Sequence, residues 1–336
     1  MKQTLILLFS FFTLTVLAQD VKELQETARN FMKNGDFTNA ILVLQKASTH
    51  DPKNVDLQKD MVMAYYYNRD YTNAKMVVEK LIDRDDADIQ SFQLAGNVYK
   101  ALEENKECEK AYKKALKKFP TSGALYNELG ELQWGKGNSE AIQQWEKGIE
   151  LDPNYAGNYY NAARYYFVTT DKVWALVYGE MFVNMESYTT RTAEIKSLLL
   201  EAYKKFFTDD AALAKKETKT KDNEFARAFI ETLNKNAPEV IGGITPETMV
   251  MVRTRFILDW FETNAARFPN RLFDHQRQLL QEGMFDAYNQ WLFGAADNLA
   301  QYEVWTKTHQ EEYDQFTKLQ RNKLFKVPQG QYYQKL

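Results

Sequence analysis

Apolar residues recur at intervals of three and four positions along most of the chain, with polar and charged residues between them. This spacing places apolar side chains on one face of an α-helix. Glycine and proline, which interrupt helices, are sparse, at 14 and 7 of 336 residues. The pattern therefore predicts an all-α protein, and the length is sufficient for two domains with a sizeable core.

One stretch, residues 89–122, holds two such helical segments separated by a short polar turn. Its large and small residues fall at set positions of a 34-residue period; they are Phe92, Ala95, Gly96, Tyr99, Cys108, Tyr112, Ala115 and Pro120. This spacing resembles the signature of the tetratricopeptide repeat family, in which each repeat is a pair of antiparallel helices.

The same register matches further stretches on both sides of this one. The predicted repeats are residues 21–54, 55–88, 89–122, 123–155 and 156–189. Because a single repeat cannot bury its own apolar face, the repeats are expected to stack on one another. The resemblance implies a right-handed superhelix over residues 19–207, in which a single amphipathic helix at 190–207 caps the last repeat.

The register does not resume beyond Thr208. Residues 208–221 are highly charged with few apolar residues, which predicts a linker that is either an exposed connection or a frayed helix end. Residues 222–336 again show helical spacing and predict a smaller C-terminal helical domain. The sequence therefore predicts two structural domains with their boundary at residues 208–221.

A regular apolar stripe runs from Phe285 to Phe316. It predicts one long helix over about residues 284–323, and the stripe is a candidate surface for self-association. The chain after Val327 cannot continue this helix because Pro328 follows. Tyr332 and Tyr333 in the tail are either docked on the body or free to bind.

The first residues have the character of a signal peptide rather than of the fold. Lys2 precedes an apolar run from Leu5 to Leu17, and the small residues Val16 and Ala18 precede Gln19. We expect cleavage after Ala18, so that residues 1–18 are removed and the chain is exported. The apolar run is shorter than the roughly 20 residues that span a bilayer, so no stable membrane span is expected after cleavage. The resemblance to exported tetratricopeptide proteins implies the periplasm.

In the family that the repeats resemble, the first helix of each repeat lines a concave groove. Transferred to this chain, the candidate partner-binding residues are Arg29, Tyr66, Tyr67, Asn97, Asn127, Trp134, Tyr160, Arg164 and Phe167. Aromatic and arginine side chains carry much of the energy of protein interfaces, and asparagine can hydrogen-bond a peptide backbone. The expected partner is another protein or an extended peptide. Alternatively, the aromatic residues pack against the C-terminal domain or are wedged between adjacent repeats.

The formal net charge of −3 and the lack of a basic cluster exclude a nucleic-acid-binding protein. Cys108 is the only cysteine, which excludes an internal disulfide bond, and its position between the two helices of a repeat predicts a buried structural thiol. Among the three histidines, His50 is expected at an exposed corner. His309 shares the apolar stripe and is expected to be a hydrogen-bonded core residue.

The sequence contains no glycine-rich phosphate loop, nucleophile elbow or paired metal ligands. We therefore expect no cofactor, no metal and no enzymatic activity. The leading interpretation is a non-enzymatic scaffold or adaptor that binds a component of a bacterial cell envelope. The alternative is a helical hydrolase or lytic enzyme in the C-terminal domain, with the repeats docking its substrate.

Overall fold

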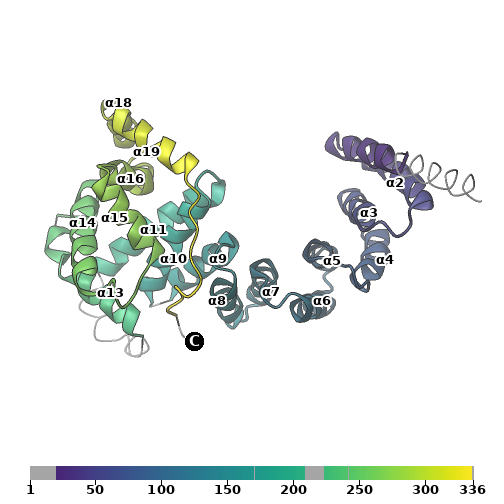
Figure 1. Cartoon of the computed structure of the whole chain (residues 1–336), viewed down its shortest axis with the longest axis horizontal. Helices are drawn as coiled ribbons and strands as arrows, with labels where there is room; N and C mark the ends of the chain where they lie inside the picture. The colour runs from purple at the N-terminus through teal and green to yellow at the C-terminus, as the bar shows by residue number, and fades with distance from the viewer. Residues whose placement is uncertain (1–19, 170, 209–222, 241, 335–336) are drawn as a thin grey trace, which may run out of the picture. The chain divides into compact units, whose positions relative to one another are not determined.

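The computed structural model describes residues 20–169, 171–208, 223–240 and 242–334. Within these ranges the regular structure is helical throughout, which confirms the all-α prediction (Figure 1). The chain divides into two compact units, Met1–Pro120 (unit 1) and Thr121–Leu336 (unit 2). The predicted signal peptide lies outside the described residues.

Unit 1 consists of consecutive antiparallel helices that follow the predicted repeats. Residues 20–33 are helical, and the following helices are α2 (Phe37–His50), α3 (Val55–Tyr67), α4 (Tyr71–Ile82), α5 (Ile89–Ala101) and α6 (Asn105–Lys118). Aspartate residues cap the N-termini of α2, α4 and α5. Asp36, Asp70 and Asp88 each accept a hydrogen bond from a backbone N–H of the first helical turn. The first helices of successive repeats, α3 and α5, pack against each other.

The third repeat shows why its small residues are needed. Gly96 on α5 lies directly against the buried ring of Tyr112 on α6, and an added Cβ would lie 1.8 Å from the tyrosine oxygen. The thiol of Cys108 is buried and lies 3.7 Å from the carbonyl oxygen of Gly96. The expected buried structural thiol is therefore confirmed.

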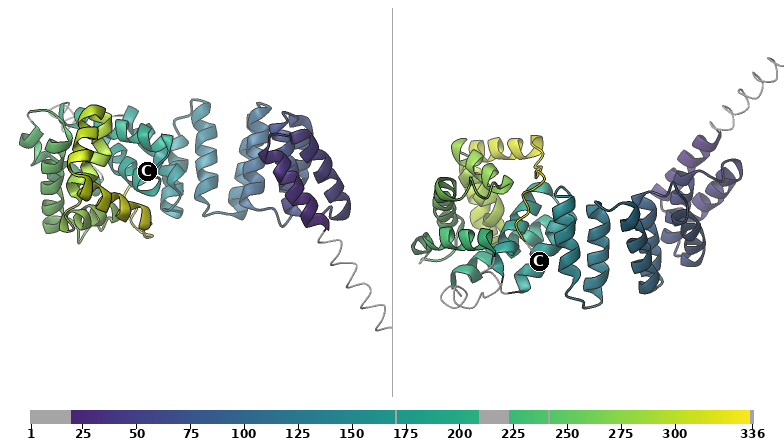
Figure 2. Two further views of the ribbon diagram at one scale, coloured as in Figure 1. Left: turned by 90° about the horizontal axis from the view of Figure 1, so that it is seen from above. Right: turned by 60° about the horizontal axis from the view of Figure 1, so that its bottom comes forward.

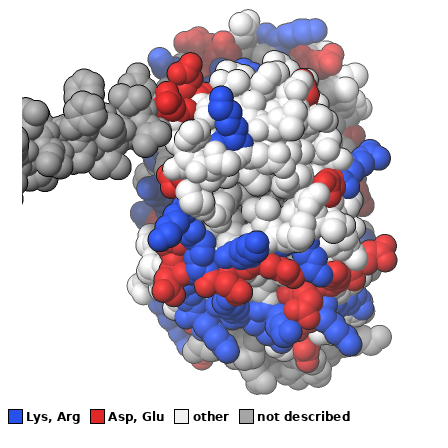
Figure 3. Space-filling view, turned by 90° about the vertical axis from the view of Figure 1, so that its right-hand side faces the viewer, with Lys and Arg blue, Asp and Glu red and all other residues white. Residues whose placement is uncertain are grey.

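In unit 1, α2 carries a single charged side chain, Lys46, and leaves Leu42 exposed. The side of the molecule on which α2 lies shows a broad area with few charged groups (Figure 3). Tyr67 lies beside this helix, because its ring stacks on Phe37 at a centroid distance of 5.5 Å.

Unit 2 continues the helix pairs and then departs from them. Its helices up to the end of the repeats are α7 (Gly123–Gly135), α8 (Ala141–Leu151), α9 (Ala156–Val168), α10 (Lys172–Met185) and α11 (Thr190–Thr208). The next ones are α13 (Glu224–Asn234), the 3₁₀-helix η2 (Ala237–Val240), α14 (Pro246–Thr263) and α15 (Arg271–Gln281). Helix α11 packs on α9 and α10, at the place expected for a capping helix.

Helix α10 is buried on every side. All its residues from Lys172 to Asn184 are buried, because α13 and α15 cover the side that α9 and α11 leave open (Figures 1 and 2). A helix whose sequence is apolar all round requires such a cover. The repeats from α8 onward and the C-terminal helices consequently share one hydrophobic core.

This arrangement differs from the domain boundary drawn from the sequence. The predicted linker, residues 208–221, lies outside the described residues except for Thr208, whereas the contacts divide the chain at Pro120. The physical reason lies in α10, whose apolar outer side holds the last repeats and the C-terminal helices together.

The predicted single helix over residues 284–323 is wrong, because the chain bends twice. The observed segments are α16 (Phe285–Asn289), the π-helix η3 (Gln290–Gly294), α17 (Ala295–Asp297), α18 (Leu299–Thr308) and α19 (Gln310–Asn322). Asn298 has an extended backbone, and its side chain caps α18 by accepting from the N–H of Gln301. At the second bend, His309 leaves the helical conformation with φ −118° and ψ 36°.

Part of the stripe is buried. Phe285, Tyr288 and Phe316 lie in the core of unit 2, whereas Leu299 is 59 % exposed. One further expectation about the stripe is corrected. His309 is exposed rather than in the core, because the bend directs it outward, where its ring stacks on Trp305 at 4.4 Å. By contrast, His50 is exposed as expected. Among the described residues, every helix is too short or too polar to cross a bilayer.

Candidate partner-binding surface

In unit 1 the candidate residues lie at or near the surface. The guanidinium of Arg29 is paired with the Asp60 carboxylate at 2.8 Å, and Gln25 donates to the same carboxylate at 2.7 Å. Tyr67 is 54 % exposed, whereas Tyr66 is half-buried between Tyr67 and Tyr71.

Asn97 is also exposed, on α5. Unit 1 therefore presents Arg29, Tyr67 and Asn97 to solvent, while Tyr66 serves partly to pack its neighbours.

In unit 2 a compact group of side chains joins α9 to α11. We call it the Tyr160 cluster; it consists of Tyr160, Arg164, Arg191 and Glu194. The Tyr160 hydroxyl donates to Glu194 Oε2 at 2.6 Å, and Arg164 Nε lies 3.0 Å from Glu194 Oε1. The guanidinium carbons of both arginines lie 5.0 Å from the centre of the Tyr160 ring. Burial raises the pKa of Tyr160 to about 12, so its hydroxyl remains a donor at neutral pH.

Trp134 lies near the end of α7 and remains 44 % exposed. Its ring contacts Trp145, with centroids 6.1 Å apart, and meets Tyr165 of α9 edge-on at 5.5 Å. Trp145 is itself buried against Gly130, where a Cβ would lie 2.3 Å from its indole nitrogen. Trp134 is thus an exposed aromatic side chain whose ring is held in place by Trp145 and Tyr165.

Asn127 does not lie open in a groove, contrary to its predicted exposure. It is buried, and its amide nitrogen donates to Glu131 Oε1 at 3.0 Å. Asn161 of α9 donates to Asn127 Oδ1 at 2.9 Å and to the same Glu131 oxygen at 3.0 Å. The two asparagines therefore join α7 to α9, and their internal hydrogen bonds compete with any bond to a peptide.

Asn161 was not among the predicted residues, although a signal for it existed. It stands 34 positions after Asn127, which is one period of the repeat.

Phe167 is half-buried near the end of α9. Lys205 of α11 lies over its ring at 4.2 Å, and Lys172 approaches the same ring at 5.8 Å. Phe167 thus helps to pack α11, as in the alternative interpretation of the aromatic residues. We define the candidate surface of unit 2 as Trp134, Tyr165 and the Tyr160 cluster, on α7, α9 and α11.

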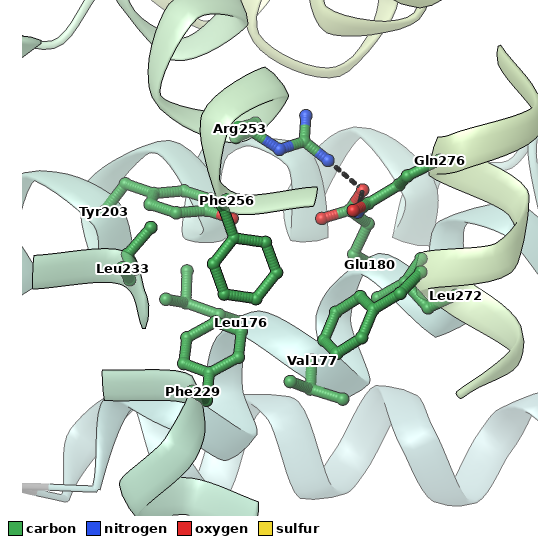
Figure 4. Close-up of a pocket in the computed structure, with 11 residues that line it drawn as sticks. Leu176, Val177, Glu180, Tyr203, Phe229, Leu233, Arg253, Phe256, Leu272 and Gln276 are labelled. Carbon is green, nitrogen blue, oxygen red and sulfur yellow. Dashed lines mark hydrogen bonds and ion pairs between the residues drawn. The ribbon is translucent and has the colours of Figure 1, made fainter. Parts of the chain in front are cut away.

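A second polar group of unit 2 is buried. We call it the Glu180 network; it consists of Glu180, Arg253, Gln276 and Tyr288. Arg253 pairs with Glu180 Oε1 (Figure 4). The same oxygen accepts from Gln276 at 2.6 Å and from Tyr288 at 2.7 Å. The cavity beside the network has a volume of about 10 Å³, which is the space of about one water molecule and too little for a substrate.

His275, the buried histidine of unit 2, also lies among packed side chains. Burial, together with the positive charges of Arg271 and Lys323, lowers the pKa of His275 to about 3. Its ring meets those of Tyr288 and Phe325 edge-on, and its Nδ1 has no hydrogen-bond partner in the described part of the chain. Over the same residues, no group of three or more His, Cys, Asp or Glu side chains converges as metal ligands.

Comparisons with known proteins give likenesses of fold only. No protein-family model and no curated protein matches the chain. TTC0263, a tetratricopeptide repeat protein of Thermus thermophilus, is 13 % identical, with a TM-score of 0.44 over 54 % of this chain and 99 % of that one. A tetratricopeptide repeat protein of Parabacteroides merdae is 15 % identical, with a TM-score of 0.44 over 76 % of this chain and 97 % of that one.

MamA of Desulfovibrio magneticus is 16 % identical, with a TM-score of 0.39 over 53 % of this chain and 94 % of that one. The class of the protein rests on its own helices. Antiparallel helix pairs that follow a 34-residue register, with glycine packed against a large aromatic ring at Gly96 and Gly130, form a tetratricopeptide repeat fold.

Proposed function

We propose that the chain is a non-enzymatic scaffold that binds another protein, or an extended peptide of one, on the candidate surface of unit 2. The observation that carries this proposal is the Tyr160 cluster together with Trp134, where aromatic and arginine side chains are held firmly and still reach solvent. Side chains of these types dominate the binding energy of protein interfaces.

The geometry favours binding because these anchors are already ordered. Tyr160 is fixed by its bond to Glu194 and by the Phe182 ring at 5.2 Å, and Trp134 is fixed by Trp145 and Tyr165. An anchor that is ordered before binding loses less side-chain entropy when the partner arrives. The Arg164 guanidinium, about half exposed, can also hydrogen-bond a carboxylate of the partner.

A double substitution tests the surface. Tyr160→Ala with Arg164→Ala should reduce recovery of a crosslinked partner from the native cell at least tenfold, since two central anchors are removed. The matched control is Tyr188→Ala with Arg321→Ala. This pair is also an exposed tyrosine beside an arginine, with the guanidinium 5.9 Å from the ring, but it lies outside the candidate surface. Equal recovery by both double variants and the natural chain would remove the assignment.

We further propose that the chain acts in a bacterial cell envelope after export to the periplasm. The predicted signal peptide, residues 1–18, supports this location. Mass spectrometry of the protein from fractionated cells should find a mature N-terminus at Gln19 in the periplasmic fraction. An uncleaved Met1 in the cytoplasm would contradict the proposal.

A helical hydrolase or lytic enzyme in the C-terminal helices is the competing function. It requires a polar cleft, whereas the Glu180 network is sealed around a cavity of about 10 Å³. Hydrolysis of cell-wall material by the purified chain, lost on replacement of His275 or His309, would favour the enzyme over the scaffold.

A further inference from the structure

The last part of the chain is an extended segment that lies against unit 2. After α19 it runs without helical structure past the α8–α9 turn and on to α13 (Figure 1, yellow). We call residues 325–334 the tail. Several of its side chains are buried although the segment has no regular structure of its own; they are Phe325, Val327 and Gln334.

The body of unit 2 holds the backbone of the tail with side-chain amides. Asn154, in the α8–α9 turn, accepts from the N–H of Val327 at 2.9 Å and donates to its carbonyl oxygen at 3.1 Å. Near the other end, Asn223 donates to the carbonyl oxygen of Tyr333 at 2.8 Å. These bonds hold the backbone itself, as at a site that binds an extended peptide.

The side chains of the tail occupy separate places on the body. At its start, the Phe325 ring lies 5.6 Å from the His275 ring and 4.9 Å from the Arg271 guanidinium. At its end, Tyr333 stacks on Phe225 at 4.8 Å and donates to the carbonyl oxygen of Pro269 at 2.6 Å.

Between these places, the Tyr332 hydroxyl bonds to the buried carboxyl of Glu146. Gln334 donates to the Tyr166 hydroxyl at 3.0 Å. The spaced side-chain contacts and the held backbone together give the tail the character of a bound peptide.

We propose that the tail is a peptide ligand bound within its own chain, and that the groove it fills binds the same segment when it is supplied as a separate molecule. This site differs from the candidate surface, because its residues come from α8, the α8–α9 turn, α13 and α15 and from Tyr166. The class of ligand is an extended peptide with an aromatic residue and a valine at its start and a tyrosine pair near its end. The tethered tail keeps the groove filled, because its effective concentration is in the millimolar range.

The test uses the full chain, folded before it is cut. A protease recognition sequence is inserted between Lys323 and the exposed Leu324, the chain is cleaved, and the cut tail is removed by dilution and dialysis. A fluorescent peptide of residues 324–336 is then titrated against cleaved and uncleaved protein, with anisotropy as the readout. We expect saturable binding to the cleaved protein and at least hundredfold weaker binding to the uncleaved one.

Matched variants locate the binding. Asn154→Ala in the body should weaken the peptide about tenfold, since two backbone hydrogen bonds are lost, and so should Tyr333→Ala in the peptide. The controls are Gln143→Ala, which removes an exposed amide of α8, and Lys326→Ala in the peptide, which removes an exposed side chain. Both controls should leave the affinity unchanged.

Three results would overturn the proposal. One is a cleaved protein that keeps its circular dichroism and tryptophan fluorescence but does not bind the peptide. A second is equal binding to cleaved and uncleaved protein, which would place the peptide elsewhere. The third is loss of the fold on cleavage, which would make the tail an inseparable part of the core. Partner recovery by the double variant of Tyr160 and Arg164 is measured separately. Failure of the tail proposal would therefore not contradict the proposed binding on the candidate surface.

Discussion

Replacing Glu146 with glutamine should stabilise unit 2 at neutral pH. The carboxyl of Glu146 is buried between α8, α9 and α10, with the Tyr166 and Tyr178 hydroxyls at 2.7 and 2.8 Å. Burial raises its pKa to about 8, and this outweighs the lowering effect of the tyrosine hydrogen bonds. The native protein therefore keeps a proton on Glu146 at pH 7 that the unfolded chain releases.

The size of the effect follows from the two pKa values. The ordinary pKa of glutamate is 4.5, so between this value and about 8 the native state binds one proton more than the unfolded state. The free energy of unfolding then falls by about 1.4 kcal/mol for each pH unit gained. By pH 7 the loss amounts to about 3 kcal/mol, and above pH 8 it is complete. Glutamine does not titrate, so Glu146→Gln should recover up to about 3 kcal/mol of the free energy of unfolding at pH 7.

The difference in the free energy of unfolding between variant and natural protein depends on pH. This dependence separates the effect of Glu146 from those of other titrating groups. His275 acts in the opposite direction, because its pKa is lowered to about 3 and its stabilising contribution is lost as the pH falls below 6.5. That contribution is common to both proteins and cancels. The advantage of Glu146→Gln should therefore rise from near zero at pH 4.5 to its full value above pH 8.

Urea unfolding followed by tryptophan fluorescence measures the effect, since all six tryptophans, from Trp134 to Trp305, belong to unit 2. Glu150→Gln, an exposed site on the same helix, is the control and should change the stability by less than about 0.5 kcal/mol at every pH. Parallel stability curves for Glu146→Gln and the natural protein would refute the reasoning.

Other predictions concern buried contacts of each unit. Glu180→Gln should destabilise unit 2 by about 3–5 kcal/mol in the same urea assay, because Arg253 is left as an uncompensated buried charge; a loss below about 1 kcal/mol would contradict it. In unit 1, Gly96→Ala should cost about 1–3 kcal/mol or more, because the new Cβ overlaps the buried Tyr112 ring; urea titration with far-ultraviolet circular dichroism measures it, and an unchanged transition would contradict it. Cys108 should react with a thiol reagent only as fast as unit 1 opens, and rapid labelling of the native protein would show that the thiol is exposed.

The helix pairs could be predicted from sequence because each repeat must satisfy the same packing requirement. Gly96 and Gly130 each face a large aromatic ring on the next helix, and their small size allows the two backbones to approach. That requirement recurs at a fixed spacing, so a single register locates most of the helices. The exposure of His50 and the burial of Cys108 follow from the same register.

The C-terminal part lacks such a repeated requirement, and periodicity alone misled there. The stripe from Phe285 to Phe316 keeps helical spacing across two bends, because residues on either side of a bend can still face one core. Asn298 is the residue that indicates the first bend, since asparagine is a favoured cap at the start of a helix and Asn298 caps α18. Apolar spacing gives no signal of such a break.

The candidate surface was predicted in part for a related reason. Family positions place both Tyr160 and Arg164 among the candidate residues. In the structure the two side chains are in contact, with the guanidinium carbon 5.0 Å from the ring centre. Family positions do not indicate which polar residues satisfy one another. Asn127 is buried because Asn161 of the next repeat bonds to it, which is a pairwise property of two repeats.

Helix α10 explains why unit 2 extends beyond the repeats. A second helix of a repeat normally keeps a polar outer side, but the sequence of α10 offers only Glu180 among apolar residues along its middle. Because an isolated buried carboxylate is costly, the helices that cover α10 must bring Arg253, Gln276 and Tyr288 to it. Apolar residues could fill the same space in several ways, whereas the hydrogen bonds to Glu180 Oε1 are satisfied in one arrangement of α14, α15 and α16. The Glu180 network thus joins α10 to α14, α15 and α16, the helices that cover the last repeat.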